Sequence, residues 1–142
     1  MRAGTENLYG IVGFAKALEM AMAGYEKDSA YIQSLKTYMM EQLRKNIPAV
    51  QFNGDQEGRC LYTVLSTAFP KTEKSEMLLM SLDMNSICVS GGSACSSGAD
   101  VGSHVIRAIN NDPNRVTVRF SFSKHNTKEE VDAVVSKVKE LI

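Results

Sequence analysis

The feature that most constrains the fold is a change in hydrophobic period at Pro48. Upstream, apolar residues recur every three or four positions, the spacing of amphipathic helices. This spacing predicts a first helix from Leu8 that stops at Gly24, and a second that Asp28 or Ser29 caps and that ends before Pro48. The apolar positions of the two helices are Ile11, Val12, Phe14, Ala15, Leu18, Met22, Tyr31, Ile32, Leu35, Tyr38, Met39 and Leu43. Four methionines, Met20, Met22, Met39 and Met40, are expected to fill the core.

Downstream of Pro48, short runs of β-forming residues alternate with shorter helical patterns. Strands are predicted at 50–52, 61–69, 86–90 and 116–122, and helices at 74–83, from 101 and from 128. The first two strands are expected to pair antiparallel, and Thr127 with Glu130 forms a capping box for the last helix. The order α-α-β-β-α-β-α-β-α predicts an α+β domain with one small mixed or antiparallel sheet covered by helices.

Composition excludes several classes of function. The 142 residues suit one domain, and sixteen basic residues balance sixteen acidic ones, which argues against nucleic-acid binding. No apolar run is long enough to cross a membrane, and the N-terminus lacks the apolar core of a signal peptide, so we expect a cytoplasmic protein. Three cysteines without metal-ligand spacing predict free thiols and no metal site, with Cys60 and Cys88 buried and inert.

A run of glycine and serine, residues 90–98, carries the third cysteine, Cys95. Such a run has too little apolar surface to fix itself, so it is either a plain strand-to-helix turn or a loop that moves a reactive thiol. Val101 stands where a phosphatase loop needs arginine, and no Gly-Lys-Ser/Thr follows for a nucleotide-binding loop. A papain-type site lacks its signature around His104, His125 and Asn126, so both histidines are expected at the surface.

Four segments together resemble the C-terminal part of the NifS-like cysteine desulfurases. They are RAGTENLYGIVG at 2–13, VSGGSACSS at 89–97, SHVIRAI at 103–109 and VRFSFS at 118–123. These enzymes belong to the class V aminotransferase group of pyridoxal-phosphate proteins of fold type I. The resemblance implies that residues 1–142 are their small C-terminal domain, with 1–26 the remnant of the junction to the cofactor domain. The cofactor lysine would lie in that other domain, so the piece alone is expected to be inactive.

The resemblance also implies roles for three residues. Cys95 matches the nucleophile that takes sulfur from L-cysteine as a persulfide and releases L-alanine. Arg119 matches the arginine that binds the substrate α-carboxylate, and alternation in its strand puts it opposite the apolar face. Thr5 matches a threonine that contacts the pyridoxal-phosphate phosphate of the partner subunit, which implies a homodimer. A sulfur-acceptor or scaffold protein for iron–sulfur or thio-cofactor synthesis is the implied partner.

Two alternatives stay open. Another class V enzyme, such as a selenocysteine lyase or an aminotransferase, would share the fold and would not need the loop cysteine. A stand-alone persulfide carrier would use Cys95 without any cofactor. Without the resemblance, Arg119 is simply an exposed strand residue and Thr5 a turn residue.

Overall fold

The computed structural model describes residues 4–91, 103–109 and 112–142. At its centre is a three-stranded antiparallel sheet in the order β1-β2-β3, formed by Gln51–Phe52, Val64–Pro70 and Arg115–Ser121. Thr67 of β2 pairs with Phe52 on one side and with Val118 on the other. The expected antiparallel pairing of the first two strands is therefore confirmed.

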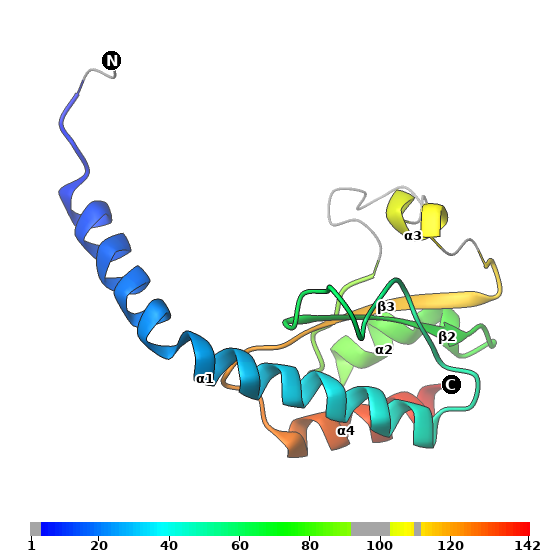
Figure 1. Ribbon diagram of the computed structural model, residues 1–142. Coiled ribbons are helices and arrows are strands. Elements are labelled where there is room, and N and C mark those ends of the chain that lie inside the picture. Colours follow the sequence, from blue (N-terminus) through cyan, green and yellow to red (C-terminus); the bar gives the residue numbers. More distant parts are fainter. Residues whose placement is uncertain (1–3, 92–102, 110–111) are drawn as a thin grey trace.

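Helices cover the two faces of this sheet unequally (Figure 1). On one face lie α1 (Leu8–Asn46), the one-turn η1 (Ser75–Met77) with α2 (Leu78–Met84), and α4 (Lys128–Leu141). The short α3 (His104–Ile109) lies over the other face. The expected fold class, an α+β domain with one small sheet covered by helices, is confirmed.

The core lies between the sheet and α1, α2 and α4. It is built from apolar side chains that are all buried, none more than 6% exposed: Met39, Met40, Leu43, Ile47, Leu65, Phe69, Leu78, Leu82, Val118, Phe120, Val131, Val135 and Val138. Alternation in β3 places Val118 and Phe120 in this core and leaves Arg119 exposed on the other face, as expected. The sheet therefore separates an apolar core from the face that carries Arg119.

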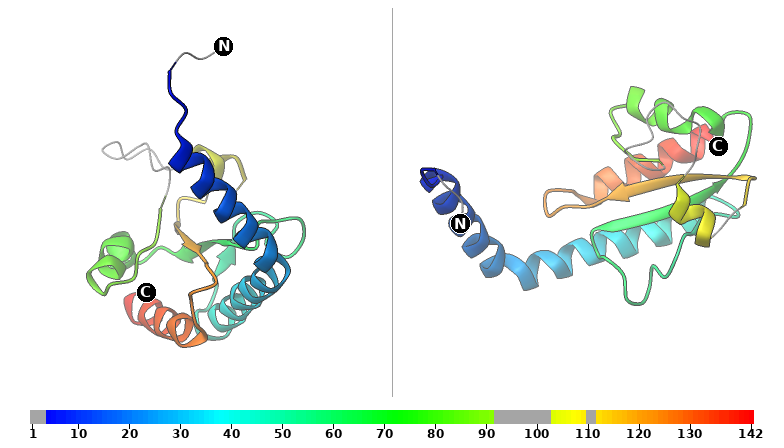
Figure 2. Two further views of the ribbon diagram at one scale, coloured as in Figure 1. Left: turned by 90° about the vertical axis from the view of Figure 1, so that its left-hand side faces the viewer. Right: turned by 90° about the horizontal axis from the view of Figure 1, so that it is seen from above.

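The expected break between two N-terminal helices is absent, because α1 runs without interruption for 39 residues. The residues that predicted the break have other partners. The Ser29 hydroxyl donates to the Glu26 carbonyl inside the helix, and Asp28 forms an ion pair with Lys124 at 2.9 Å. One glycine costs a helix only about 1 kcal/mol, so Gly24 does not end α1. The helix axis bends along its length (Figure 2).

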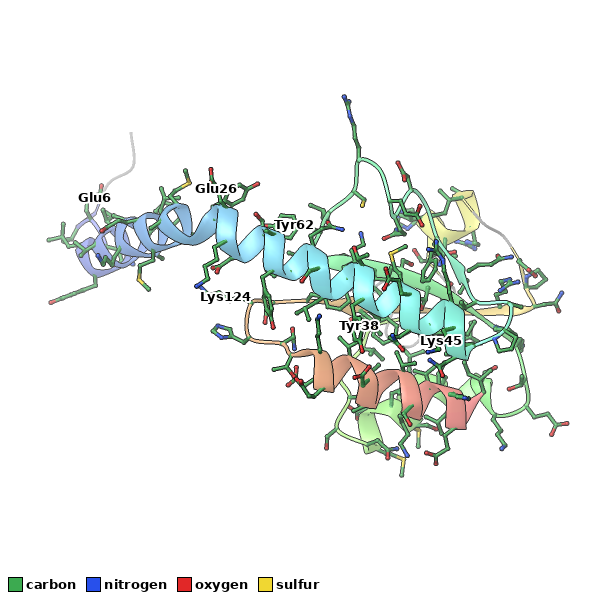
Figure 3. All side chains as sticks on the ribbon, turned by 60° about the horizontal axis from the view of Figure 1, so that its bottom comes forward. Glu6, Glu26, Tyr38, Lys45, Tyr62 and Lys124 are labelled. Atoms are coloured by element: carbon green, nitrogen blue, oxygen red, sulfur yellow. The ribbon has the colours of Figure 1, made fainter. Side chains whose placement is uncertain are left out.

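The N-terminal half of α1 projects beyond the sheet, and this corrects the expectation for its apolar residues. Its large apolar side chains are more than half exposed: Leu8, Tyr9, Ile11, Val12, Phe14, Leu18, Met20, Met22 and Tyr25. Met20 and Met22 are therefore not core residues, whereas Met39 and Met40 are. Figure 3 shows side chains around this half of α1, near Glu6, with no other described element beside them.

The strand expected at 86–90 is not formed, apart from a single bridge at Ser90. Ser86 has a left-handed backbone (φ 62°), and its amide donates to the Asp83 carbonyl at 2.8 Å. The Ile87 amide donates to the Leu82 carbonyl at 2.9 Å. Both amides therefore close the end of α2 and are not available to a sheet ladder.

The capping box of α4 is present as expected. The Thr127 hydroxyl accepts from the Glu130 amide, and the Glu130 carboxylate accepts from the Thr127 amide at 3.1 Å. α4 then packs along the C-terminal half of α1, where Tyr38 donates to Asp132 at 2.8 Å (Figure 3). None of the described helices is long and apolar enough to traverse a lipid bilayer.

Candidate functional site

Arg119 lies in the middle of β3, on the sheet face away from the core. Its partner in the antiparallel register is Ser66 of β2. Residues directly opposite in such a pair have neighbouring side chains on the same face. The sheet therefore brings the Arg119 guanidinium and the Ser66 hydroxyl to one place.

A cavity of about 370 Å³ opens over this face. Sheet residues and the loop after β1 form its polar side, and α3 forms its apolar side. The lining residues are Asn53, Gly54, Gln56, Ser66, Ser103, Val105, Ile106, Ile109, Thr117 and Arg119. Arg119 supplies the cationic group of this lining, so the cavity suits a small molecule with a carboxylate and an apolar portion.

The side chains of Asn53 and Gln56 determine which hydrogen-bonding groups lie at the polar wall of the cavity. The Asn53 side-chain amide donates to the Ser66 hydroxyl at 3.2 Å, which leaves the hydroxyl proton of Ser66 free to donate elsewhere. The Gln56 Oε1 atom is buried, and no described group donates to it. The wall thus offers donors from Arg119 and Ser66.

The backbone of Arg119 also forms hydrogen bonds with Ser90, the first residue of the glycine–serine segment. The Arg119 amide donates to the Ser90 carbonyl at 2.7 Å, and the Ser90 amide donates to the Arg119 carbonyl at 3.1 Å. Ser90 lies five positions before Cys95. The chain that leads to Cys95 therefore leaves the sheet at Arg119.

The structure does not bring all three expected site residues together. Arg119 lines the cavity, and Cys95 falls outside the described residues. Thr5 is exposed on the segment before α1, at the opposite end of that helix from the sheet (Figure 1).

The described residues of this chain do not by themselves make a pyridoxal-phosphate site. No lysine occurs among the described residues that line the cavity, and an imine-forming amine is what that cofactor needs for covalent attachment. Thr5, the one residue expected to contact the cofactor phosphate, is not part of the cavity.

The other polar candidates behave differently from one another. His104 and His125 are exposed, as expected. Asn126 bonds through its side chain to the Ser123 amide and to Glu130, so it shapes the turn before α4. The described residues contain no cluster of three or more metal-binding side chains.

The two cysteines within the described residues correct the expectation that both are buried. Cys88 is exposed, because the strand meant to bury it is not formed, and it borders a separate apolar cavity on the core side of the sheet. Cys60 is only partly buried, and its sulfur accepts a hydrogen bond from Lys36. Sequence patterns also gave no signal for Asn53, Gln56 or Ser66, which reach the cavity through strand register and a loop turn.

The fold and the cavity define a small α+β domain that presents an arginine beside the first residue of the glycine–serine segment, Ser90. The family model described as aminotransferase class V matches residues 1–134, and the chain belongs to that family. It is 37% identical over 144 residues to the putative cysteine desulfurase IscS 1 of Bacillus subtilis (strain 168), covering 99% of this chain and 38% of that protein. It is 34% identical over 143 residues to the cysteine desulfurase IscS of Dictyoglomus turgidum, covering 99% and 36%.

A solved structure gives the same picture. The NifS-like protein of Rickettsia africae ESF-5 superposes with a TM-score of 0.78 at 25% identity, covering 99% of this chain and 36% of that one. The chain thus spans about a third of the length of these relatives.

Proposed function

We propose that this chain is the C-terminal small domain of a cysteine desulfurase, whose substrate is L-cysteine. The observation that carries the proposal is the Arg119 cavity and its backbone link to the segment that bears Cys95. The guanidinium binds the α-carboxylate of the substrate with two parallel hydrogen bonds, a geometry that lysine cannot reproduce. Desulfurase names among the relatives support the choice of reaction.

Cys95 takes the sulfur in this proposal. Its thiolate attacks the substrate sulfur, a sulfur–sulfur bond forms, and the carbon–sulfur bond of L-cysteine breaks. A proton replaces sulfur on the carbon, so that one thiol and one L-cysteine give one persulfide and one L-alanine. Pyridoxal phosphate, supplied by the rest of the complete protein, provides the electron sink that makes this bond breakable.

The rest of the assignment concerns the complete protein. Residues 1–26 form the junction with the cofactor domain, a role that suits the exposed apolar half of α1. Thr5 contacts the cofactor phosphate of a partner subunit in a homodimer. The persulfide passes to a sulfur-acceptor or scaffold protein for iron–sulfur or thio-cofactor synthesis, and the protein works in the cytoplasm.

Three variants of the complete protein test the proposal. With L-cysteine, the wild type releases L-alanine, and sulfide in the presence of a reductant. Cys95→Ala abolishes sulfide release, whereas the matched Cys88→Ser variant keeps it. Arg119→Lys raises KM for L-cysteine about 10- to 100-fold, the loss of about 1.5–3 kcal/mol expected for a charge-assisted contact. Normal sulfur release by Cys95→Ala would contradict the assignment of the nucleophile.

The same assays separate the alternatives. A selenocysteine lyase would act on L-selenocysteine in preference to L-cysteine and would tolerate Cys95→Ala. A class V aminotransferase would form a keto acid in place of alanine. A persulfide carrier would accept sulfur on Cys95 from a persulfide donor and release no L-alanine from L-cysteine.

A further inference from the structure

Lys36 is the one charged side chain that the described structure buries completely. It lies in the C-terminal half of α1 and has 0% exposure. Its Nζ donates to the Sγ of Cys60 at 3.1 Å and to the carbonyl of Leu61 at 3.0 Å. No ion pair among the described residues includes Lys36, although a buried ammonium is usually paired with a carboxylate.

Cys60 is held against this amine from its other side. Its thiol donates to the Gln56 carbonyl at 3.2 Å, so Sγ is fixed between a carbonyl and an ammonium group. Cys60 is half-buried, so small oxidants reach it. The proposed function uses neither Lys36 nor Cys60, although both side chains are nucleophiles.

We propose that Lys36 and Cys60 are an oxidation-dependent cross-linking site. Hydrogen peroxide first oxidises the Cys60 thiol to a sulfenic acid, and one water is released. The Lys36 nitrogen then attacks that sulfur, a sulfur–nitrogen bond forms, and the sulfenic hydroxyl leaves as water. The ammonium group gives up two protons, one to that water and one to solvent. Overall, one thiol, one ammonium and one peroxide give one sulfenamide, two waters and one proton.

The geometry favours this cross-link over further oxidation of the sulfur. Sulfenic acids condense with a nitrogen atom that is already in contact, as they do with backbone amides. The Lys36 amine is in contact with Sγ before oxidation, and complete burial keeps it from moving away. Formation of the bond therefore needs only a small local movement.

The cross-link would join α1 to the loop between β1 and β2. Asn53 and Gln56 of that loop line the Arg119 cavity, and the Cys60 thiol donates a hydrogen bond to the Gln56 carbonyl. Oxidation removes the thiol proton and with it this hydrogen bond. The site therefore couples peroxide to the wall of the cavity through the short loop segment from Gln56 to Cys60.

The test is peptide mass spectrometry on the complete protein after brief treatment with hydrogen peroxide. Trypsin no longer cleaves at a cross-linked lysine, so residues 28–44 stay joined to residues 60–71. The joined peptides weigh about 2 Da less than the sum of their reduced masses, because two hydrogen atoms are lost. Dithiothreitol reverses the linkage and restores cleavage after Lys36.

Two cysteine variants serve as a matched pair. Cys88→Ser removes an exposed thiol that no lysine contacts in the described residues, and it keeps the cross-link. Cys60→Ser loses it. Lys36→Arg keeps the positive charge without a reactive amine, so Cys60 goes on to the sulfinic acid.

The proposal is overturned if a folded wild-type protein, checked by circular dichroism, shows oxidised Cys60 while trypsin still cleaves fully at Lys36. An unchanged Cys60 under conditions that oxidise Cys88 also overturns it. If Lys36→Arg does not fold, the wild-type and cysteine variants decide alone. Because Cys95 and Arg119 take no part, L-alanine release by the complete protein can fail without affecting this result.

Discussion

The two halves of α1 have similar apolar spacing and opposite environments. In the C-terminal half, Leu35 and Leu43 are completely buried, and Leu43 belongs to the core that α1 shares with the sheet and α4. In the N-terminal half, Leu18 is 51% exposed and Tyr9 is 93% exposed. Apolar periodicity therefore marks a face that needs a partner, and it does not say whether that partner belongs to the same domain.

The largest expected effect tests this contrast directly. Leu35→Ala removes a completely buried side chain and should lower the free energy of unfolding of the 142-residue chain by about 2–5 kcal/mol. The matched Leu18→Ala should change it by about 0.5 kcal/mol or less. Urea denaturation measures both. If the two variants of the 142-residue chain lose equal unfolding free energy, the two halves of α1 do not differ in burial as described.

The same Leu18→Ala substitution in the complete protein tests whether the exposed half of α1 has a partner there. If residues 1–26 join a cofactor domain there, Leu18→Ala should cost more than it does in the 142-residue chain. If Leu18→Ala lowers the unfolding free energy equally in both proteins, the exposed half of α1 no longer supports the proposed junction.

A second, smaller effect concerns α4, which provides part of the surface against which the C-terminal half of α1 packs. Thr127→Ala removes one side of the capping box and should destabilise the domain by about 1 kcal/mol. Thermal unfolding followed by circular dichroism measures this. Thr37→Ala, an exposed site on α1, is the control and should be near neutral.

The contribution of Glu130 depends on pH. Its hydrogen bond from the Asn126 side chain, with a further bond from the Thr127 amide, lowers the pKa of the Glu130 carboxyl. A lowered folded-state pKa gives stability that is present above the unfolded pKa and is lost as pH falls through the folded value. Glu130→Gln should therefore be destabilising at pH 7, and the difference should shrink at acid pH. A difference that is constant from pH 7 to acid would contradict the assignment.

The smallest effect lies at the boundary between the two halves of α1. Lys124→Ala removes the ion pair with Asp28, in which the lysine side chain is 52% exposed. Such surface pairs contribute about 0.5 kcal/mol or less, and added salt should reduce the effect further. A loss above about 1 kcal/mol in urea denaturation would show that the boundary contributes more than a surface contact.

Local patterns predicted those elements whose environment is set by neighbours in sequence. Alternation in 116–122 gave the correct face for Arg119, and the Thr127–Glu130 spacing gave the correct start of α4. The failures came from one long-range partner and from one local turn that the β-forming pattern did not reveal. Asp28 contributes to an ion pair with Lys124 and caps no helix, and the Ser86 amide closes α2, so Cys88 is left exposed.

The residues of the candidate site also divide into one that a local pattern predicted and others that only long-range structure brings together. Its arginine follows from strand alternation, whereas Ser66 reaches the cavity only because β2 and β3 pair in one particular register. Gln56 comes from a loop turn, and the contact of Lys36 with Cys60 joins residues 24 positions apart. No periodicity within one segment contains that information. The roles of Cys95, Arg119 and Thr5 stay predictions.

The pair of backbone hydrogen bonds between Ser90 and Arg119 sets a limit on the chemistry. An extended chain spans at most about 3.3–3.6 Å per residue, so the five steps from Ser90 to Cys95 allow a reach of about 17 Å. In the proposed function, a sulfur acceptor must therefore come within this distance of Ser90, extended only by the length of the cysteine side chain. Inserting a few residues between Ser90 and Cys95 would raise this upper limit and lower the effective concentration of the thiol at Arg119.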